Sequence, residues 1–282
     1  MADRIWRCGT RALLLDRPLV MGVVNVTPDS FYDGGETADP LSALARGREL
    51  AAAGADIIDV GGESTRPGAA PVDPAEEIAR VRPVISALLL EDLCVSVDTR
   101  HARVASACAD AGVHIINDVA GFRDRAMVKV AASCDAGLVV MHMGGEPATM
   151  QDAPVYDDVV ADVRDYLERQ AFRLRDAGVA RDRIALDPGI GFGKTLEHNL
   201  ELLRRLGEIA ALGYPVVVGT SRKRFIGTLL DEPDVRRRLW GSVGAAVAAT
   251  ARGAAVVRVH DVGETVQALK VAHAIDAGEA AW

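Results

Sequence analysis

Short apolar runs recur along the chain, and each ends in residues that a buried core strand does not need. The runs and the residues that follow them are Val23-Val24 with Asn25, Ile57-Ile58 with Asp59, Val95-Ser96-Val97 with Asp98, Ile115-Ile116 with Asn117, Leu138-Val139-Val140 with Met141-His142, Ala185-Leu186 with Asp187, Val216-Val217-Val218 with Gly219-Thr220-Ser221, and Val256-Val257 with Arg258 and His260. Buried parallel strands are typically continuous runs of Val, Ile and Leu. We therefore predict eight parallel strands whose C-terminal ends carry a functional site.

Helical patterns separate these runs. They cover a stripe of leucines at positions 196, 200, 203 and 206, a long polar-faced segment at 157–176, a segment that begins after Pro74, and a last segment at 262–274. Strand and helix alternate eight times with no Pro/Ser-rich linker. The pattern predicts an α/β fold, a closed (β/α)8 TIM barrel, with an open doubly wound sheet as the alternative.

The first 18 residues lie outside this eightfold pattern. Cys8-Gly9-Thr10 has the composition of a turn, so residues 1–18 are predicted to form a short hairpin that covers the barrel floor. Residues 19–282 are predicted to form a single barrel domain.

Composition narrows the class of protein. The chain has 282 residues, of which 49% are hydrophobic, and this suits a large buried core. Its formal net charge of −8 argues against nucleic acid as a partner. The longest basic run, residues 236–238, is expected to face solvent. The four cysteines are too scattered for a C-x-x-C site, and no apolar stretch is long enough to span a membrane. We therefore expect a soluble, cytoplasmic protein.

Two groups of strand-end residues suggest chemistry. Arg258 and His260 are two residues apart on the last strand and point to the same side; with Ser221-Arg222-Lys223 before a helix, they suggest an anion site. Each could instead be an ordinary hydrogen-bonded structural residue.

Asp98, Asn117 and Asp187 form the second group. Each could merely cap a helix, but together they offer acceptors and an amide that could grip the donor edge of a flat nitrogen heterocycle. Met141 lies between them as an apolar wall or as simple core filling.

Three glycine-rich loops follow strands. Residues 27–35 and 61–68 are candidate mobile lids or ordinary surface turns, and residues 189–195 match neither a Walker A loop nor a Rossmann fingerprint. The last of these is predicted to be a flexible loop in which Phe192 stacks on something flat. No zinc motif is present, whereas Mg²⁺ can be held by one protein oxygen plus substrate phosphates, and Asn25 could supply that oxygen.

Five motifs, in order along the chain, carry a resemblance to a known family. They are Met21-Gly-Val-Val-Asn-Val-Thr-Pro-Asp-Ser-Phe31, Gly61-Gly-Glu-Ser-Thr-Arg-Pro-Gly68, Asp187-Pro-Gly-Ile-Gly-Phe-Gly-Lys194, Ser221-Arg-Lys-Arg-Phe225 and Arg258-Val-His260. This set resembles the signatures of the dihydropteroate synthases. The resemblance implies a folate-pathway enzyme that joins 6-hydroxymethyl-7,8-dihydropterin diphosphate to p-aminobenzoate and releases pyrophosphate.

The resemblance also implies roles for individual residues. Asp98, Asn117, Asp187 and Lys223 would hold the pterin with Met141 against its face; Asn25 would bind Mg²⁺; Asn25, Arg66, Arg258 and His260 would surround the diphosphate; Phe31, Thr65, Pro67, Phe192 and Ser221 would shape the aminobenzoate slot. Asp98, Lys223, Arg258 and His260 would be the catalytic group, acting by an SN1-like route. A homodimer is implied as well, although the small-residue segment 241–251 could equally pack on its own barrel.

Two alternatives stay open at this point. One is a pterin-binding barrel of the methyltetrahydrofolate–corrinoid methyltransferase type, which has no need of the diphosphate residues. The other is a homologue that binds pterin without catalysis.

Overall fold

The computed structural model describes residues 4–27, 40–64, 71–145, 154–278 and 282. Eight parallel strands form its centre: β3 (Leu19–Asn25), β4 (Ile57–Gly61), β5 (Val95–Asp98), β6 (Ile115–Asp118), β7 (Gly137–Met141), β8 (Ile184–Asp187), β9 (Val217–Val218) and β10 (Val256–Val259). From β3 to β8 each strand pairs with the next, and β10 pairs with both β3 and β9. A parallel bridge between Leu186 and Val216 joins the remaining edges of β8 and β9. The sheet is therefore a closed barrel, as predicted, and the open sheet is excluded.

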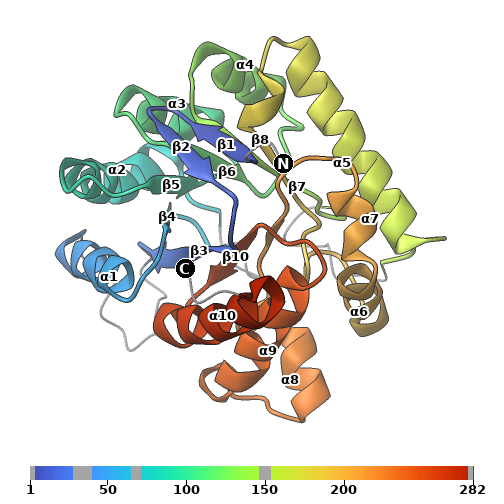
Figure 1. Cartoon of the computed structure of the whole chain (residues 1–282). Coiled ribbons are helices and arrows are strands. Elements are labelled where there is room, and N and C mark those ends of the chain that lie inside the picture. Colours follow the sequence, from blue (N-terminus) through green and yellow to red (C-terminus); the bar gives the residue numbers. More distant parts are fainter. Residues whose placement is uncertain (1–3, 28–39, 65–70, 146–153, 279–281) are drawn as a thin grey trace.

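Helices surround the barrel on its outside (Figure 1). They are α1 (Pro40–Ala52), α2 (Pro74–Leu90), α3 (Ala102–Asp110), α4 (Arg125–Ser133), α5 (Val159–Asp176), α6 (Leu196–Arg204), α7 (Leu206–Ala210), α8 (Arg224–Leu230), α9 (Leu239–Thr250) and α10 (Val262–Ala277). The leucine stripe predicted one helix but spans two, because the chain leaves helical geometry at Arg205. Leu200 in that stripe is exposed.

The two faces of the strands have different surroundings. Residues such as Ile58, Val60, Val140 and Leu186 point outward and pack with the helices in one large apolar cluster. The alternate residues belong to a separate cluster inside the barrel, which holds Met21, Ile57, Ile115, Val139, Ala185, Val217 and Val256. Because side chains alternate along a strand, the next inward positions are two residues further on. There the interior becomes polar.

The N-terminal segment forms the predicted hairpin. Strands β1 (Ile5–Cys8) and β2 (Arg11–Leu14) pair antiparallel and lie across one end of the barrel (Figure 1). Trp6 is fully buried in the inner apolar cluster, and its indole N–H donates to the Arg183 carbonyl at 3.0 Å. The hairpin therefore closes the barrel floor.

One surface prediction is wrong. Arg236 and Arg237 are exposed as expected, but Arg238 is buried. Its guanidinium donates to the carbonyls of Glu232 at 3.0 Å and Pro233 at 2.8 Å, because a buried cation must find acceptors.

Among the described residues, no helix combines the length and the apolar character that crossing a membrane requires.

Candidate active site

The predicted site residues gather at the C-terminal ends of the strands. Asn25, Asp98, Met141 and Asp187 are the last residues of β3, β5, β7 and β8. The others lie in or directly after strands at the same end: Asn117 in β6, Phe192 after β8, Ser221 and Lys223 after β9, Arg258 in β10 and His260 after it. The barrel thus brings together ten residues from seven strands and the segments that follow them.

Arg258 occupies the centre of this group. Its Nε donates to Asp59 Oδ2 at 2.6 Å, and one terminal nitrogen donates to Asp98 Oδ2 at 2.7 Å. Asn117 Nδ2 donates to the same Asp59 oxygen at 3.2 Å. The residues assigned to pterin and to diphosphate are therefore parts of one connected network.

Asp59 belongs to the same network, and its predicted position at the end of a strand is wrong. It was expected to end a strand, but β4 continues to Gly61, so Asp59 lies in mid-strand and is fully buried inside the barrel. The available signal was the alternation of side chains: Ile57 and Asp59 share the inward face.

Burial controls the protonation of these carboxyls. Desolvation raises the pKa of Asp98 to about 7, and the Arg258 guanidinium opposes this rise. The pKa of Asp187 is also raised by burial, with Lys223 acting in the opposite direction. Asp98 can therefore exchange a proton near neutral pH, which suits a group that responds to charge developing on a ligand.

Lys223 and Phe192 form one wall of the mouth. The Lys223 ammonium donates to the Ile190 carbonyl and lies 4.5 Å from the centroid of the Phe192 ring. Burial lowers the pKa of Lys223 to about 8, against the effect of Asp187. Gly191 has a φ of +84°, and a Cβ there would approach the Lys223 side chain to 2.9 Å, so this turn requires glycine.

Met141 lies in a small apolar cluster of its own. It packs with Val119 and Met143, and the partly buried Phe192 covers them. Two methionines and an aromatic ring offer a polarizable surface to a flat ligand. The role of Met141 as a wall for the pterin stays a prediction.

Ser221 and His260 are joined directly. His260 Nδ1 and Ser221 Oγ are 3.0 Å apart, and the His260 backbone N–H donates to the same oxygen at 3.2 Å. Arg222, between Ser221 and Lys223, pairs instead with Asp261 at 2.6 Å. Arg222 therefore contributes to the structure that surrounds the site.

The loop after β8 is more constrained than predicted. Its lysine, Lys194, is 4% exposed and donates to the carbonyls of Gly189 and Phe192, both at 2.9 Å. Burial lowers the pKa of Lys194 to about 7. Lys194 ends the motif that begins at Asp187, and the motif by itself assigns it no role.

Among the described residues, one group has the donor atoms to hold a metal ion, namely Glu63, Glu77 and His101. Glu63 is already held by Arg100, whose Nε and terminal nitrogen both lie 3.0 Å from its oxygens. The predicted metal ligand Asn25 is half-buried at the mouth and offers one amide oxygen. One hard oxygen suits Mg²⁺ when substrate phosphates and water supply the other ligands.

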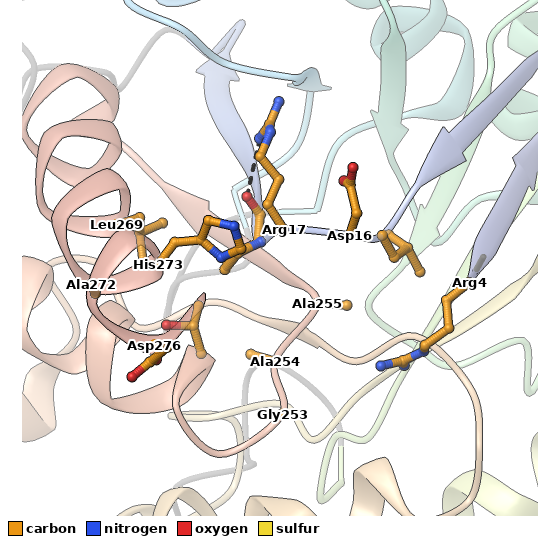
Figure 2. A pocket seen from close by; sticks show the side chains of 13 residues that line it. Arg4, Asp16, Arg17, Gly253, Ala254, Ala255, Leu269, Ala272, His273 and Asp276 are labelled. Atoms are coloured by element: carbon orange, nitrogen blue, oxygen red, sulfur yellow. Dashed lines mark hydrogen bonds between the residues drawn. The ribbon is translucent and has the colours of Figure 1, made fainter. Parts of the chain in front are cut away.

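A hollow of about 230 Å³ lies at the opposite end of the barrel and is separate from this site. Figure 2 shows Arg17, His273 and Asp276 on its wall. Arg17 is paired there with Asp56 at 2.6 Å. None of the predicted site residues lines this hollow.

Four predicted site residues lie outside the described part of the chain. They are Phe31, Thr65, Arg66 and Pro67. Their assignments to diphosphate and p-aminobenzoate stay predictions.

Comparison with known proteins agrees with this geometry. The model of the family described as pterin binding enzyme matches residues 21–260. The chain therefore belongs to the pterin-binding enzyme family.

Several proteins similar to this chain are dihydropteroate synthases. The dihydropteroate synthase of Neisseria meningitidis serogroup C is 48% identical over 98% of this chain and 99% of its own length. Two solved structures resemble this chain over almost its whole length. The Xanthomonas albilineans dihydropteroate synthase with 4-aminobenzoic acid has a TM-score of 0.92 at 46% identity, covering 98% of this chain and 99% of that one. The Burkholderia cenocepacia dihydropteroate synthase with 7,8-dihydropteroate has a TM-score of 0.90 at 44% identity, covering 98% of each chain.

Proposed function

We propose that this chain is a dihydropteroate synthase of folate biosynthesis. It condenses 6-hydroxymethyl-7,8-dihydropterin diphosphate with p-aminobenzoate to give 7,8-dihydropteroate and pyrophosphate. The observation that carries the proposal is the barrel mouth, where buried Asn117 and Asp187 and the partly buried Asp98 lie with Lys223 and Arg258 beside an apolar wall. Relatives that match almost the whole chain are dihydropteroate synthases.

The pterin is proposed to lie between Met141 and the carboxylates. Asp187 and Asn117 would face the polar edge of the ring, because acceptors and an amide match its donors and acceptors. A ring whose polar groups found no partners here would bind more weakly, because each unpaired buried polar group costs about 1–3 kcal/mol. Lys223 would approach the same ring from the Phe192 side.

The diphosphate is proposed to leave before the amine attacks. Arg258 and His260 would neutralise the leaving group, together with Arg66 from outside the described residues, and bound Mg²⁺ supplies further charge neutralisation there. The dihydropterin ring can delocalise the positive charge left on its methylene, and the Asp98 carboxylate would stabilise that cation. No covalent protein nucleophile is required.

A pyrophosphate-release assay with both substrates tests the function. We expect pyrophosphate and dihydropteroate in equal amounts, and only when both substrates are present. Methyl transfer from methyltetrahydrofolate to a corrinoid would support the methyltransferase alternative, and binding without turnover would support the non-catalytic one.

Mg²⁺ is the proposed cofactor, with Asn25 as its protein ligand. Asn25→Ala should raise the Mg²⁺ concentration needed for half-maximal rate, whereas Asn25→Asp keeps an oxygen ligand and should change it less. Full activity in excess chelator would rule out the metal.

Substrate binding is proposed to be ordered, with the pterin diphosphate first. Glycine-rich segments such as 27–35 and 61–68 lose much conformational entropy when they are ordered, and Arg66 is proposed to pair with the bound diphosphate. Titration of p-aminobenzoate with and without pyrophosphate, Mg²⁺ and a pterin measures this. Equal affinity in both cases would mean that the slot is preformed.

The proposed assembly is a homodimer, and the proposed compartment is the cytoplasm. Helix α9 buries Val243 and Ala246 against its own barrel, while Trp240 on another part of the helix is 75% exposed. Ile275 of α10 is also 75% exposed, and large exposed apolar side chains are typical of interfaces. We expect sedimentation equilibrium to give twice the monomer mass, and Trp240→Glu to reduce it. The described cysteines are free thiols, which suits a reducing compartment.

A further inference from the structure

The loops after β7 and β8 are tied together by one buried cation. Lys194 Nζ lies 2.9 Å from the carbonyl oxygens of both Gly189 and Phe192, and 2.9 Å from Nδ1 of His142. His142 belongs to the loop after β7, so the ammonium reaches across both loops. An ammonium has three N–H donors, which these three acceptors can satisfy, while the His142 carbonyl lies further away at 3.5 Å.

The backbones of the two loops also approach closely. Gly193 has a φ of +62°, and a Cβ there would lie 2.7 Å from the Gly144 carbonyl. Tyr156 donates from its hydroxyl to the Gly193 carbonyl at 2.8 Å. The close approach of the two backbones therefore leaves room for one arrangement of this loop pair. Lys194 donates to the loop carbonyls that this arrangement buries.

The acceptor on His142 is held in place by aromatic rings. The imidazole lies edge-on to the Tyr166 ring, with centroids 4.9 Å apart, and near Tyr156 at 6.1 Å. Burial lowers the pKa of His142 to about 2, and the nearby Lys194 charge acts in the same direction. A neutral imidazole can accept from Lys194 through Nδ1, which a protonated one cannot.

Phe192 is the residue that this arrangement places. Its carbonyl is held by Lys194, and its ring lies under the Lys223 ammonium and against the cluster of Met141 and Met143. We propose that Lys194 is a positioning residue that locks the loops after β7 and β8 and so sets Phe192 as the wall of the p-aminobenzoate slot. The role of the wall rests on the proposed function; the lock does not.

The experiment compares Lys194→Met with Lys129→Met, a matched change at a lysine of α4 outside this network. Amide hydrogen exchange of residues 189–195 measures the lock without any substrate. We expect exchange about 10-fold faster or more in Lys194→Met and unchanged in Lys129→Met. Equal exchange in the two variants would overturn the lock.

Steady-state kinetics then measures the wall. Lys194→Met should raise the KM for p-aminobenzoate about 10-fold while the dissociation constant of the pterin, measured alone, changes less than about 2-fold, because a disordered wall affects the second substrate. Faster exchange with an unchanged KM would overturn the assignment of Phe192. An inactive wild-type enzyme would refute the proposed function and leave the exchange result standing.

A second variant covers the case in which Lys194→Met does not fold. His142→Phe keeps a ring between Tyr156 and Tyr166 but removes the acceptor for Lys194. This variant should also accelerate exchange in residues 189–195, by a smaller factor. No acceleration in this variant would also count against the lock.

Discussion

The floor and the mouth of this barrel are built from the same strands but by opposite means. At the floor, Trp6 and inward residues such as Met21 and Ile57 are fully buried in an apolar cluster. At the mouth, two residues further along the same strands, the inward positions are occupied by Asp59 and Arg258 and by other polar groups. A step of two residues along a strand therefore separates a stabilising core from a chemical site.

This difference follows from the cost of burial. Removing apolar surface from water stabilises the fold by about 25 cal/mol per Å². Taking a carboxylate and a guanidinium out of water costs several kcal/mol per ion, and pairing offsets that cost only with good geometry. The floor therefore stabilises the barrel, whereas the mouth holds paired charges that contribute little to stability but can interact with a ligand.

The largest expected effect is on the floor. Trp6→Ala should lower the free energy of unfolding by about 3–5 kcal/mol, because it leaves a cavity and an unpaired Arg183 carbonyl. Urea denaturation measures this, with the exposed Phe172→Ala as the control. Pterin affinity should not change. A parallel loss of pterin affinity would mean that the two ends are not independent.

The next effect concerns a buried acid close to the mouth. Glu77 of α2 is fully buried, and burial raises its pKa to about 7. The folded protein keeps this proton up to about pH 7, while the unfolded chain releases it near 4.5. The free energy of unfolding should therefore fall as pH rises through this window, by at most about 3 kcal/mol.

Glu77→Gln should remove that pH dependence. The variant should be more stable than wild type at pH 8 and lose this advantage near pH 4.5, as measured by denaturation at several pH values. Glu76→Gln, at an exposed neighbour paired with Arg80, is the matched control. The same pH profile in wild type and Glu77→Gln would contradict the burial argument.

A smaller change in free energy is expected at the mouth, but with loss of binding. Asp187→Ala should weaken pterin binding at least about tenfold, or about 1.4 kcal/mol, because a ring donor loses its acceptor. Calorimetry measures it. In the wild type, Asp187 Oδ1 accepts a hydrogen bond from the Gly189 N–H at 2.7 Å, and Asp187→Asn keeps an oxygen for this bond. If the Asn variant binds pterin as tightly as wild type, the carboxylate does not carry recognition.

The smallest effect is expected from a charge on the floor hairpin. Arg7 pairs with Asp182 at 2.9 Å, but the two side chains are 65% and 48% exposed. Arg7→Gln should change the free energy of unfolding by less than about 1 kcal/mol, and less still in high salt. A larger loss would show that charge, as well as Trp6, holds the floor.

The sequence by itself determined the eight strands, their alternation with helices and the end of the barrel that carries the site. It could do so because strand burial and the two-residue period of side chains are local properties, visible in pairs such as Ala185 and Asp187. The turn at Gly9 likewise predicted a hairpin, since turn chemistry is local.

Only the tertiary structure decided which polar groups meet. Asp59 and Arg258 are 199 residues apart, and their pairing follows from the closure of the barrel, with no signal in either segment. The sequence places Lys194 in a loop that is predicted to be flexible. Its acceptor His142 lies in the loop after β7, and only the fold brings the two together. Ion pairs and pKa values depend on distance and desolvation in three dimensions, and these quantities exist only once the strands are closed around the site.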